Sequence, residues 1–404
     1  MPAFSRYGAS EHKRLGIYIH VPFCLSKCAY CDFNSSVCND PERIRKYIDA
    51  VIAHMDSYSE AAASYEPDTV FIGGGTPTSI PPAELYRLVK AVKKIFNLTE
   101  TAEFTVEMNP ATASKRVLSK LRKLGVNRLS MGLQTADENE LKALSRIHTR
   151  KDFFRSYRMA REAGFENINV DLMFGIPFQT FESLMHTIRY VASLGPEHIS
   201  LYDLKIEPGT AFHSNYEDIK AYLPEEETEY DMYLASVSLL RDLGYHQYEI
   251  SNFSRPGRRC VHNLKYWNCD EYLGFGVSAH SYFNGNRFSI IPDVDSYISS
   301  FFDPASKVVI TENVESVEER ERLGEYIMLR LRLTDGIESR EFSRRFGYSF
   351  EQLYGEKLVP YIRGGYMTAS NGTFALTPAG MFVSNYIISD ILEFEDFGKY
   401  YFGS

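Results

Sequence analysis

The chain has 404 residues, which is enough for one large domain or for a large domain and a small one. Its composition is that of an ordinary globular protein, with 44% hydrophobic and 24% charged residues. The net charge of −9 argues against broad nucleic-acid binding, which needs a basic surface. No apolar run reaches the ~18 residues of a membrane span, and no signal peptide is visible. Six cysteines, three of them crowded together, do not form a secreted disulfide framework, so we expect a cytoplasmic protein.

Strand-like and helix-like segments alternate through the first 243 residues. The pattern opens with a short strand at the start of Ile17–Asn34 and a helix from Pro41 to about Ala63, for which Asp40 is the expected cap. The elements predicted next are a strand Thr69–Ile72, a helix Pro82–Phe96, a strand Glu103–Glu107, a helix Ser114–Leu124, a strand Arg128–Leu133, helices Glu138–Ile147 and Lys151–Ala163, a strand Asn167–Met173, a helix Phe181–Leu194, a strand His198–Leu204 and a helix Glu225–Leu243.

These elements make six strand–helix units in series. Such alternation predicts an α/β fold with a parallel sheet and right-handed crossovers. Eight units would close a barrel, so six predict an incomplete parallel β/α barrel, with functional residues at the carboxyl ends of the strands. A doubly wound open sheet is the structural alternative.

The regular alternation of strands and helices does not continue beyond residue 243. From Tyr245 to about Pro292 the pattern is irregular, and this segment is expected to border or cover the open side. Beyond it we predict helices followed by a hairpin, as in a small α+β winged-helix-like module: helices Glu318–Leu331, Ser339–Phe346 and Phe350–Ile362, a hairpin Tyr366–Leu376 and a last helix Pro378–Leu392. We therefore divide the chain into an N-terminal leader (1–15), a partial barrel with its covering segment (16–305) and a C-terminal domain (306–404).

Three cysteines in the loop after the first strand are the strongest chemical signal. Cys24, Cys28 and Cys31 have the spacing CxxxCxxC and can converge on one inorganic site. A [4Fe-4S] cluster normally takes four thiolates, so three leave one iron with an open position. That iron can chelate the amino and carboxylate groups of S-adenosylmethionine (SAM). Zinc is the competing interpretation of the thiols alone, with Cys38 or His20 as its fourth ligand.

Polar and glycine residues at later strand ends suit the same ligand. The consecutive glycines of GGGTP (73–77) let backbone amides approach a ligand closely. Glu107, Gln134 and Asp171 follow later strands, and Arg146 follows the helix after the fourth strand. Carboxylates and an amide suit ribose hydroxyls and an ammonium group, whereas an arginine fork suits a carboxylate.

CxxxCxYC after a strand resembles the radical SAM superfamily. The series YIHVPFCxxxCxYCDF, GGGTPT, EMNP, GLQ, Arg146 followed by His148, and NVDLMFGIP resembles the oxygen-independent coproporphyrinogen III oxidase family over about residues 16–390. This resemblance implies a [4Fe-4S] cluster on Cys24, Cys28 and Cys31. It implies SAM binding by Tyr18, Tyr30, Gly74, Gly75, Thr76, Glu107, Gln134, Arg146 and Asp171. Equivalent positions exist at Lys205 and in the GVSAH loop near Ala279.

Two departures from the oxidases favour a different branch of this family. The oxidases carry a fourth cysteine two residues after the third, where this chain has Phe33, and they have a longer segment ahead of the cysteines. In contrast, HNLKYW (262–267) resembles the HNxxYW signature of the HemW-type heme chaperones.

Residue chemistry gives this signature a role in heme binding. A neutral imidazole is a good axial ligand for heme iron, so His262 is the candidate ligand, with Tyr266 and Trp267 stacking on the porphyrin. The structural alternative is a hydrogen-bonded His262 beside a packed tryptophan. His280 and Cys260 are weaker ligand candidates, and Cys38 and Cys269 are expected to be incidental thiols.

The predicted function is that of a heme chaperone on a radical SAM scaffold. The protein is expected to bind heme and to deliver it to acceptor hemoproteins, including membrane-associated respiratory ones. The resemblance also implies that the protein forms a homodimer. The alternative is an enzyme, the oxygen-independent coproporphyrinogen III oxidase, which decarboxylates its substrate to protoporphyrinogen IX. Radical-mediated opening of the heme ring is a third candidate, and whether the chain is an enzyme stays open at this point.

Overall fold

A computed structural model describes residues 13–392 of the chain. Most of the predicted N-terminal leader (1–15) and the last residues of the predicted C-terminal domain lie outside the described residues. The described chain divides into two compact units. The first comprises the chain up to Leu133 with Arg146–Ile168 and Asp270–Val317, and the second comprises Gln134–Ser145, Asn169–Cys269 and the chain from Glu318 onward.

Four parallel strands form the centre of the first unit. Strand β1 pairs with β4, β4 with β5 and β5 with β6, all in parallel, as the strand–helix alternation predicted. The strands of this unit are β1 (Lys13–Val21), β2 (Phe23–Cys24), β3 (Ser36–Val37), β4 (Tyr65–Gly74), β5 (Glu103–Met108), β6 (Arg128–Gln134), β11 (Tyr272–Phe275), β12 (His280–Phe283), β13 (Asn286–Ile290) and β14 (Thr311–Ser316).

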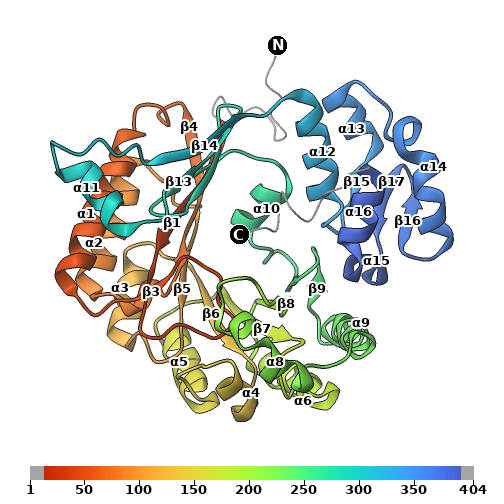
Figure 1. Ribbon diagram of the computed structural model, residues 1–404, viewed down its shortest axis with the longest axis horizontal. Coiled ribbons are helices and arrows are strands. Elements are labelled where there is room, and N and C mark those ends of the chain that lie inside the picture. The colour runs from red at the N-terminus through yellow and green to blue at the C-terminus, as the bar shows by residue number, and fades with distance from the viewer. Residues whose placement is uncertain (1–12, 393–404) are drawn as a thin grey trace. The chain divides into compact units, whose positions relative to one another are not determined.

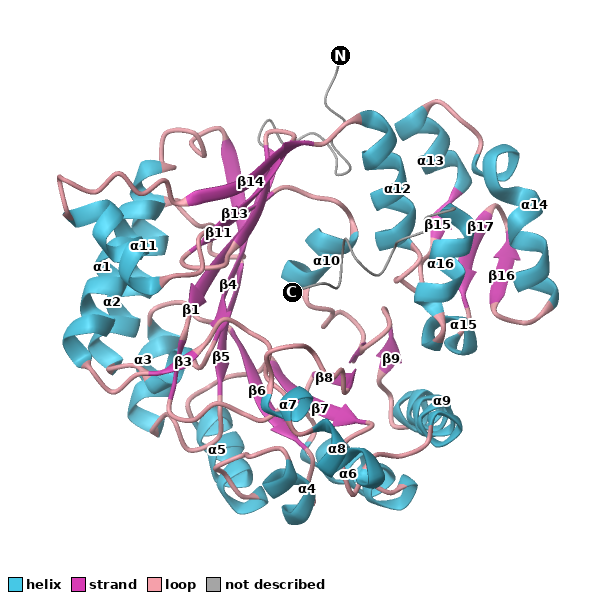
Figure 2. Cartoon of the chain, viewed as in Figure 1, coloured by secondary structure: helices cyan, strands magenta, loops and turns pink. Residues whose placement is uncertain are grey.

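The irregular segment after Tyr245 supplies edge strands. On the far side of β1 from β4, β11 pairs in parallel with β1, and β12, β13 and β14 then follow in antiparallel order (Figure 2). The short strand-like pieces predicted there are therefore real, and in this unit they extend the sheet at its edge.

Helices pack against the sheet of the first unit. They are α1 (Pro41–Ser57), α2 (Pro82–Ile95), α3 (Lys115–Lys123), α5 (Arg150–Glu162) and α11 (Val294–Phe302), with a 3₁₀ turn at Pro77–Ser79. Helix α1 lies between α2 and α11 along one side of β1 and β4 (Figure 1). The buried face of α1 includes Ile44, Tyr47, Ile48 and Val51, which follow the helical repeat of about 3.6 residues.

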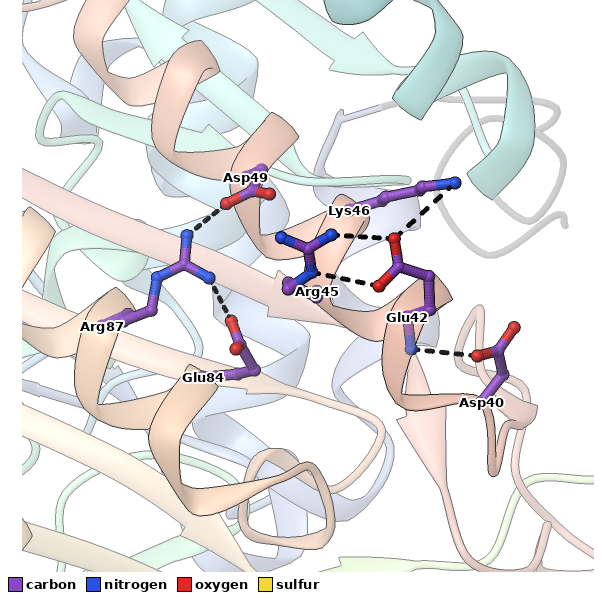
Figure 3. A network of polar contacts seen from close by, with 7 residues as sticks. All are labelled: Asp40, Glu42, Arg45, Lys46, Asp49, Glu84 and Arg87. Atoms are coloured by element: carbon purple, nitrogen blue, oxygen red, sulfur yellow. Dashed lines mark hydrogen bonds and ion pairs between the residues drawn. The ribbon is translucent and has the colours of Figure 1, made fainter.

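The start of α1 carries an exposed polar network (Figure 3). Asp40 caps the helix by accepting a hydrogen bond from the backbone nitrogen of Glu42 at 2.9 Å, as the sequence predicted. Arg87 of α2 bridges Asp49 of α1 and Glu84 of its own helix. These ion pairs connect the outer faces of the two helices.

The second unit continues the alternation and then changes to a mainly helical module. Strands β7 and β8 pair in parallel, and β10 and β9 follow in antiparallel order. The elements up to residue 269 are α4 (Glu138–Ala143), β7 (Ile168–Phe174), α6 (Phe181–Leu194), β8 (His198–Asp203), α7 (Ala211–Ser214), α8 (Tyr216–Ile219), a 3₁₀ turn Lys220–Tyr222, α9 (Glu226–Asp242), β9 (His246–Gln247), β10 (Asn252–Ser254) and α10 (Val261–Trp267).

The C-terminal part of the second unit has the predicted order of helices and hairpin. It comprises α12 (Glu319–Arg330), β15 (Ile337–Glu338), α13 (Ser339–Phe346), α14 (Phe350–Arg363), β16 (Met367–Ser370), β17 (Thr373–Leu376), α15 (Pro378–Phe382) and α16 (Ser384–Leu392). The β16–β17 hairpin turns at Asn371 and Gly372, which both have positive φ, and β15 pairs with β17. No described helix combines the length and the apolar character that crossing a membrane requires.

Candidate functional site

The three clustered cysteines lie between β1 and α1. Cys24 is on β2, which pairs with β3 on the far side of the loop. Cys24 is buried and Cys28 and Cys31 are half-buried, and none of the three forms a disulfide. The backbone nitrogen of Cys31 donates to the Cys28 carbonyl at 3.2 Å. The short β2–β3 pairing thus folds back on itself the loop that carries all three thiols.

The spacing of the thiols bears on the kind of metal site. Across residues 13–392, no three His, Cys, Asp or Glu side chains are grouped closely enough to share a single metal ion. A zinc ion needs its ligands at one point, whereas an iron–sulfur cluster distributes its thiolates over separate irons. The CxxxCxxC spacing and the three thiols of the loop are those expected of a cluster that leaves one iron open.

The glycine stretch after β4 is packed against Cys24. A Cβ atom on Gly75 would lie 3.0 Å from the Cys24 Sγ and 2.7 Å from the Phe23 carbonyl oxygen, so only glycine fits there. The Thr76 hydroxyl lies 3.7 Å from the same sulfur. The GGGTP stretch therefore lies beside the cysteine loop, as the parallel pairing of β1 and β4 requires.

Arg146 contacts the cysteine loop through its guanidinium. One Nη atom lies 3.3 Å from the Cys28 Sγ, and the other donates to the Asn109 side-chain oxygen at 2.7 Å and to the Gly132 carbonyl at 2.6 Å. Asn109 in turn donates to the Thr76 hydroxyl at 2.7 Å. Asn109 is a residue that sequence analysis missed, although the EMNP motif that contains it was recognised.

Glu107 lies at the carboxyl end of β5 and is bonded to the glycine stretch. Its Oε2 accepts from the backbone nitrogen of Gly74 at 3.1 Å, and a Cβ on Gly73 would approach the same oxygen to 2.8 Å. The pKa of the Tyr18 hydroxyl is strongly raised, mainly by burial and to a smaller extent by the nearby charge of Glu107. Tyr18, Glu107 and the glycines thus form one continuous patch of the first unit.

Tyr30 belongs to the cysteine loop itself. Burial raises the pKa of its hydroxyl, Arg146 opposes that shift, and the neighbouring Cys28 and Cys31 add to it. Burial likewise raises the pKa of the Cys24 and Cys31 thiols. Phe33 is 58% exposed at the position where the oxidases carry a further cysteine.

A second set of contacts that the sequence did not reveal holds the end of the cysteine loop. The His20 ring contacts the Tyr18 hydroxyl through Nδ1 at 3.0 Å and the Asn34 carbonyl through Nε2 at 2.8 Å. Since both ring nitrogens are engaged, His20 does not suit the role of a fourth metal ligand. Asn34 also donates to the Ser278 hydroxyl at 2.7 Å, which ties the loop to the GVSAH segment before Ala279.

The remaining SAM candidates belong to the second unit. Gln134, at the end of β6, is buried and has a φ of +73°, which a non-glycine residue rarely adopts. Asp171 on β7 accepts from the Asn169 side chain at 2.7 Å. Lys205 follows β8 and pairs with Asp203 at 2.5 Å.

The acidic run at the start of α9 is only partly solvated. Glu225, Glu226 and Glu227 are exposed, as expected for a first helical turn, but Glu229 is half-buried. Burial and the nearby Asp203 raise the pKa of Glu229 to about 7. Glu229 differs from the three residues at the start of the run because the helix periodicity turns it toward Asp203 at the end of β8.

The candidate heme residues lie on α10, a helix that sequence analysis did not predict. His262 is 1% exposed, and its Nε2 lies 2.8 Å from the Tyr266 hydroxyl one helical turn later. Trp267 stacks under the guanidinium of Arg332, whose central carbon is 4.7 Å from the ring centroid. Of the weaker candidates, Cys260 is fully buried and His280 is exposed.

Comparisons with known proteins bear on the fold and the family of the chain. Residues 18–191 match the family model of the radical SAM superfamily, and residues 317–383 match that of the HemN C-terminal domain. The solved structure of coproporphyrinogen III oxidase (HemN) from Escherichia coli, titled a radical SAM enzyme, matches with a TM-score of 0.82. It is 23% identical and covers 95% of this chain and 91% of that chain.

Curated relatives extend over nearly the whole chain. A protein of Bacillus subtilis (strain 168) named heme chaperone HemW is 37% identical, over 93% of this chain and 98% of its own length. Its namesake from Escherichia coli (strain K12) is 32% identical, over 93% of this chain and 97% of its own length.

The chain is a radical SAM protein with an α/β fold whose mostly parallel sheet is not closed, which confirms the predicted fold class. More narrowly, it belongs to the family of the heme chaperones HemW. Membership in the radical SAM superfamily implies a [4Fe-4S] cluster and SAM.

Proposed function

We propose that this protein binds heme and delivers it to acceptor hemoproteins, using a radical SAM scaffold that carries a [4Fe-4S] cluster and SAM. The observation that carries the proposal is the similarity to heme chaperones HemW over 93% of the chain. HNLKYW and the exposed Phe33 in place of a fourth cysteine support the same choice between chaperone and oxidase.

We assign the cluster to Cys24, Cys28 and Cys31. These thiols share one loop, and Arg146 contacts Cys28 and so contributes positive charge beside a thiolate ligand. When bound, a cluster of this kind supplies an iron for SAM and an electron. The residues proposed for SAM are those that adjoin the loop, Tyr18, Tyr30, Gly74, Gly75, Thr76, Glu107 and Arg146, together with Gln134 and Asp171 from the second unit.

We propose the segment around α10 as the place of heme contact. His262 supplies an imidazole, but its Nε2 must first give up the contact with the Tyr266 hydroxyl to bind iron. Tyr266 and Trp267 add aromatic surface for the porphyrin. The acceptors are hemoproteins, respiratory ones among them, and we place the protein in the cytoplasm as a homodimer.

The proposal is tested by heme binding and transfer with the anaerobically purified, cluster-reconstituted protein. Ferric heme is titrated into the protein, the Soret band is followed, and an apo-hemoprotein is then added. We expect a saturable complex at one heme per chain and loss of that complex to the acceptor. Failure to retain heme in a size-exclusion run, with an intact cluster spectrum, would contradict the proposal.

A further inference from the structure

The single tryptophan of the chain has an unsatisfied donor. The Nε1 atom of Trp267 is buried and has no hydrogen-bond partner among residues 13–392. A buried donor without a partner costs about 1–3 kcal/mol, so such groups normally have an acceptor or serve a ligand. The indole N–H at the end of α10 is therefore a donor that no described residue satisfies.

A second unsatisfied donor belongs to Arg332, whose guanidinium stacks on the Trp267 ring. Arg332 follows α12, which neighbours α10 (Figure 1), and its guanidinium lies over the Trp267 ring at 4.7 Å. Its Nε is buried and has no acceptor in the described part of the chain. Arginine carries five N–H donors in a fixed fork, and here no described acceptor is bonded to any of them.

Neighbouring groups show that this arginine differs from an ordinary structural one. Arg330, two residues earlier, donates to the Asn268 side chain at 2.7 Å and twice to the Gly336 carbonyl. The nearest acidic side chain in electrostatic terms, Glu249, is buried and accepts instead from the backbone nitrogen of Ser251 at 3.0 Å. Arg330 is thus hydrogen-bonded within the fold, whereas Arg332 interacts with Glu249 only through charge and leaves its Nε without an acceptor among residues 13–392.

Two adjacent N–H donors with a positive charge are complementary to a carboxylate. A guanidinium fork binds a carboxylate with two parallel hydrogen bonds, and the indole N–H adds a third from the side. The same six-residue segment that supplies His262 ends in Trp267, so a ligand at the imidazole has a carboxylate site close by in the chain.

We propose that Arg332 and the Trp267 indole N–H bind a propionate of heme. This inference rests on the proposed function and adds to it the group that orients the porphyrin. It predicts that the protein distinguishes heme from heme dimethyl ester, which has the same iron and ring but lacks propionate charges.

The experiment compares the binding of ferric heme and of ferric heme dimethyl ester to the full-length, cluster-reconstituted protein. The variants are Arg332→Gln and Trp267→Phe, with Arg259→Gln as the control because Arg259 forms an exposed ion pair with Asp335. We expect Arg332→Gln to lose about ten- to a hundred-fold in heme affinity and Trp267→Phe about three- to ten-fold. The control should remain unchanged within about two-fold, and Arg332→Gln should leave the affinity for the ester unchanged within the same limit.

The outcomes separate this inference from the proposed function. If the unchanged protein does not bind heme, the proposed function fails and the propionate site fails with it. If it binds heme but both variants retain full affinity, or lose affinity for heme and ester equally, only the propionate site is overturned. Should Arg332→Gln not fold, Trp267→Phe decides alone, because it removes the indole N–H and keeps an aromatic ring and the Arg332 charge.

Discussion

Cys28 is the cysteine of the loop that the Arg146 guanidinium contacts, at 3.3 Å from its sulfur. If the three thiols hold the cluster, Cys28→Ser replaces one thiolate by a poor iron ligand. We expect the reconstituted variant to lose most of its iron and its broad visible absorbance. Iron and sulfide content, measured after anaerobic reconstitution, checks this.

Cys269→Ser is the matched control, because Cys269 is also a half-buried cysteine but lies outside the loop. It should retain the iron content of the unchanged protein. If Cys28→Ser and the control contained equal amounts of iron, the assignment of the cluster to this loop would be contradicted.

His262 and Tyr266 make a pair of variants with opposite expectations. His262→Ala removes the proposed iron ligand and should weaken heme binding by about ten-fold or more, whereas Tyr266→Phe removes the hydroxyl that lies 2.8 Å from Nε2 and should leave affinity equal or higher. Heme titrations followed at the Soret band measure both. Undiminished binding by His262→Ala would make His262 a structural residue.

For single residues, the sequence predicted those that lie in motifs of characteristic spacing, but it did not reveal the residues that hydrogen-bond to them. The cysteines, GGGTP, Glu107 and Arg146 carry recognisable chemistry in recognisable motifs. Asn109 and Asn34 do not, because an asparagine in a loop is ordinary until the fold brings it to Arg146 or Ser278. Only the three-dimensional path of the chain shows that these amides position the site.

Among the elements, α1 offers a contrast between exposed and buried polar contacts. Arg87→Ala removes the exposed bridge between α1 and α2 (Figure 3) and should cost less than about 1 kcal/mol of unfolding free energy. Tyr47→Phe removes a fully buried hydroxyl that donates to the His20 carbonyl and accepts from the Val277 nitrogen. It should cost about 1–3 kcal/mol.

Urea unfolding of both variants at neutral pH measures this difference. A larger loss from Arg87→Ala than from Tyr47→Phe would show that the surface network, and not the buried contact, holds α1 in place.

The contact between α1 and α11 should make stability depend on pH. Burial lowers the pKa of His54 to about 3, and its Nδ1 lies 3.0 Å from the Tyr297 hydroxyl. The unfolded chain protonates this histidine below about pH 6.5 while the folded chain does not, so stability falls as the pH drops from about 6.5 toward 3. Between pH 6.5 and 5 the loss from His54 alone is up to about 2 kcal/mol.

Urea midpoints measured across that range test this expectation. His54→Phe should flatten the pH dependence, whereas His213→Gln, which changes an exposed histidine, should not. An unchanged slope in His54→Phe would show that other groups cause the acid sensitivity.

Element types were largely predictable and several boundaries were not. The helix Phe181–Leu194 was predicted as found, because Thr180 caps its start and Gly195, with a φ of +71°, ends it. Strand β4 starts at Tyr65 and not at Thr69, since a bulge at Asp68 accommodates Pro67 within the strand. The helix predicted from Pro41 to about Ala63 ends earlier, at Ser57.

Two helical features lacked a sequence signal. Helix α10 has no side-chain cap at Cys260 and spans only two turns, so its residues were interpreted as a motif and not as an element. The predicted last helix, Pro378–Leu392, is divided at Val383, where φ and ψ leave the helical range. No proline or glycine marks that break, which explains why periodicity alone predicted one helix.

For the whole molecule, the strand–helix rhythm was sufficient to predict the fold class, which the match to HemN confirms. The domain boundaries are a different matter. We predicted a division near residue 305, and the HemN C-terminal domain match starts at residue 317, yet residues from 318 onward group with 169–269 in one compact unit. The predicted division at 305/306 stays a prediction, because compactness and family boundaries describe different properties of the chain.

The central claim is that this scaffold carries heme and does not decarboxylate coproporphyrinogen III. The most direct test incubates the anaerobic, cluster-reconstituted protein with reductant, SAM and coproporphyrinogen III, and follows porphyrin products and 5′-deoxyadenosine. We expect no protoporphyrinogen IX, while a parallel sample retains heme. Formation of protoporphyrinogen IX with matching 5′-deoxyadenosine would contradict the claim and identify the protein as the oxidase.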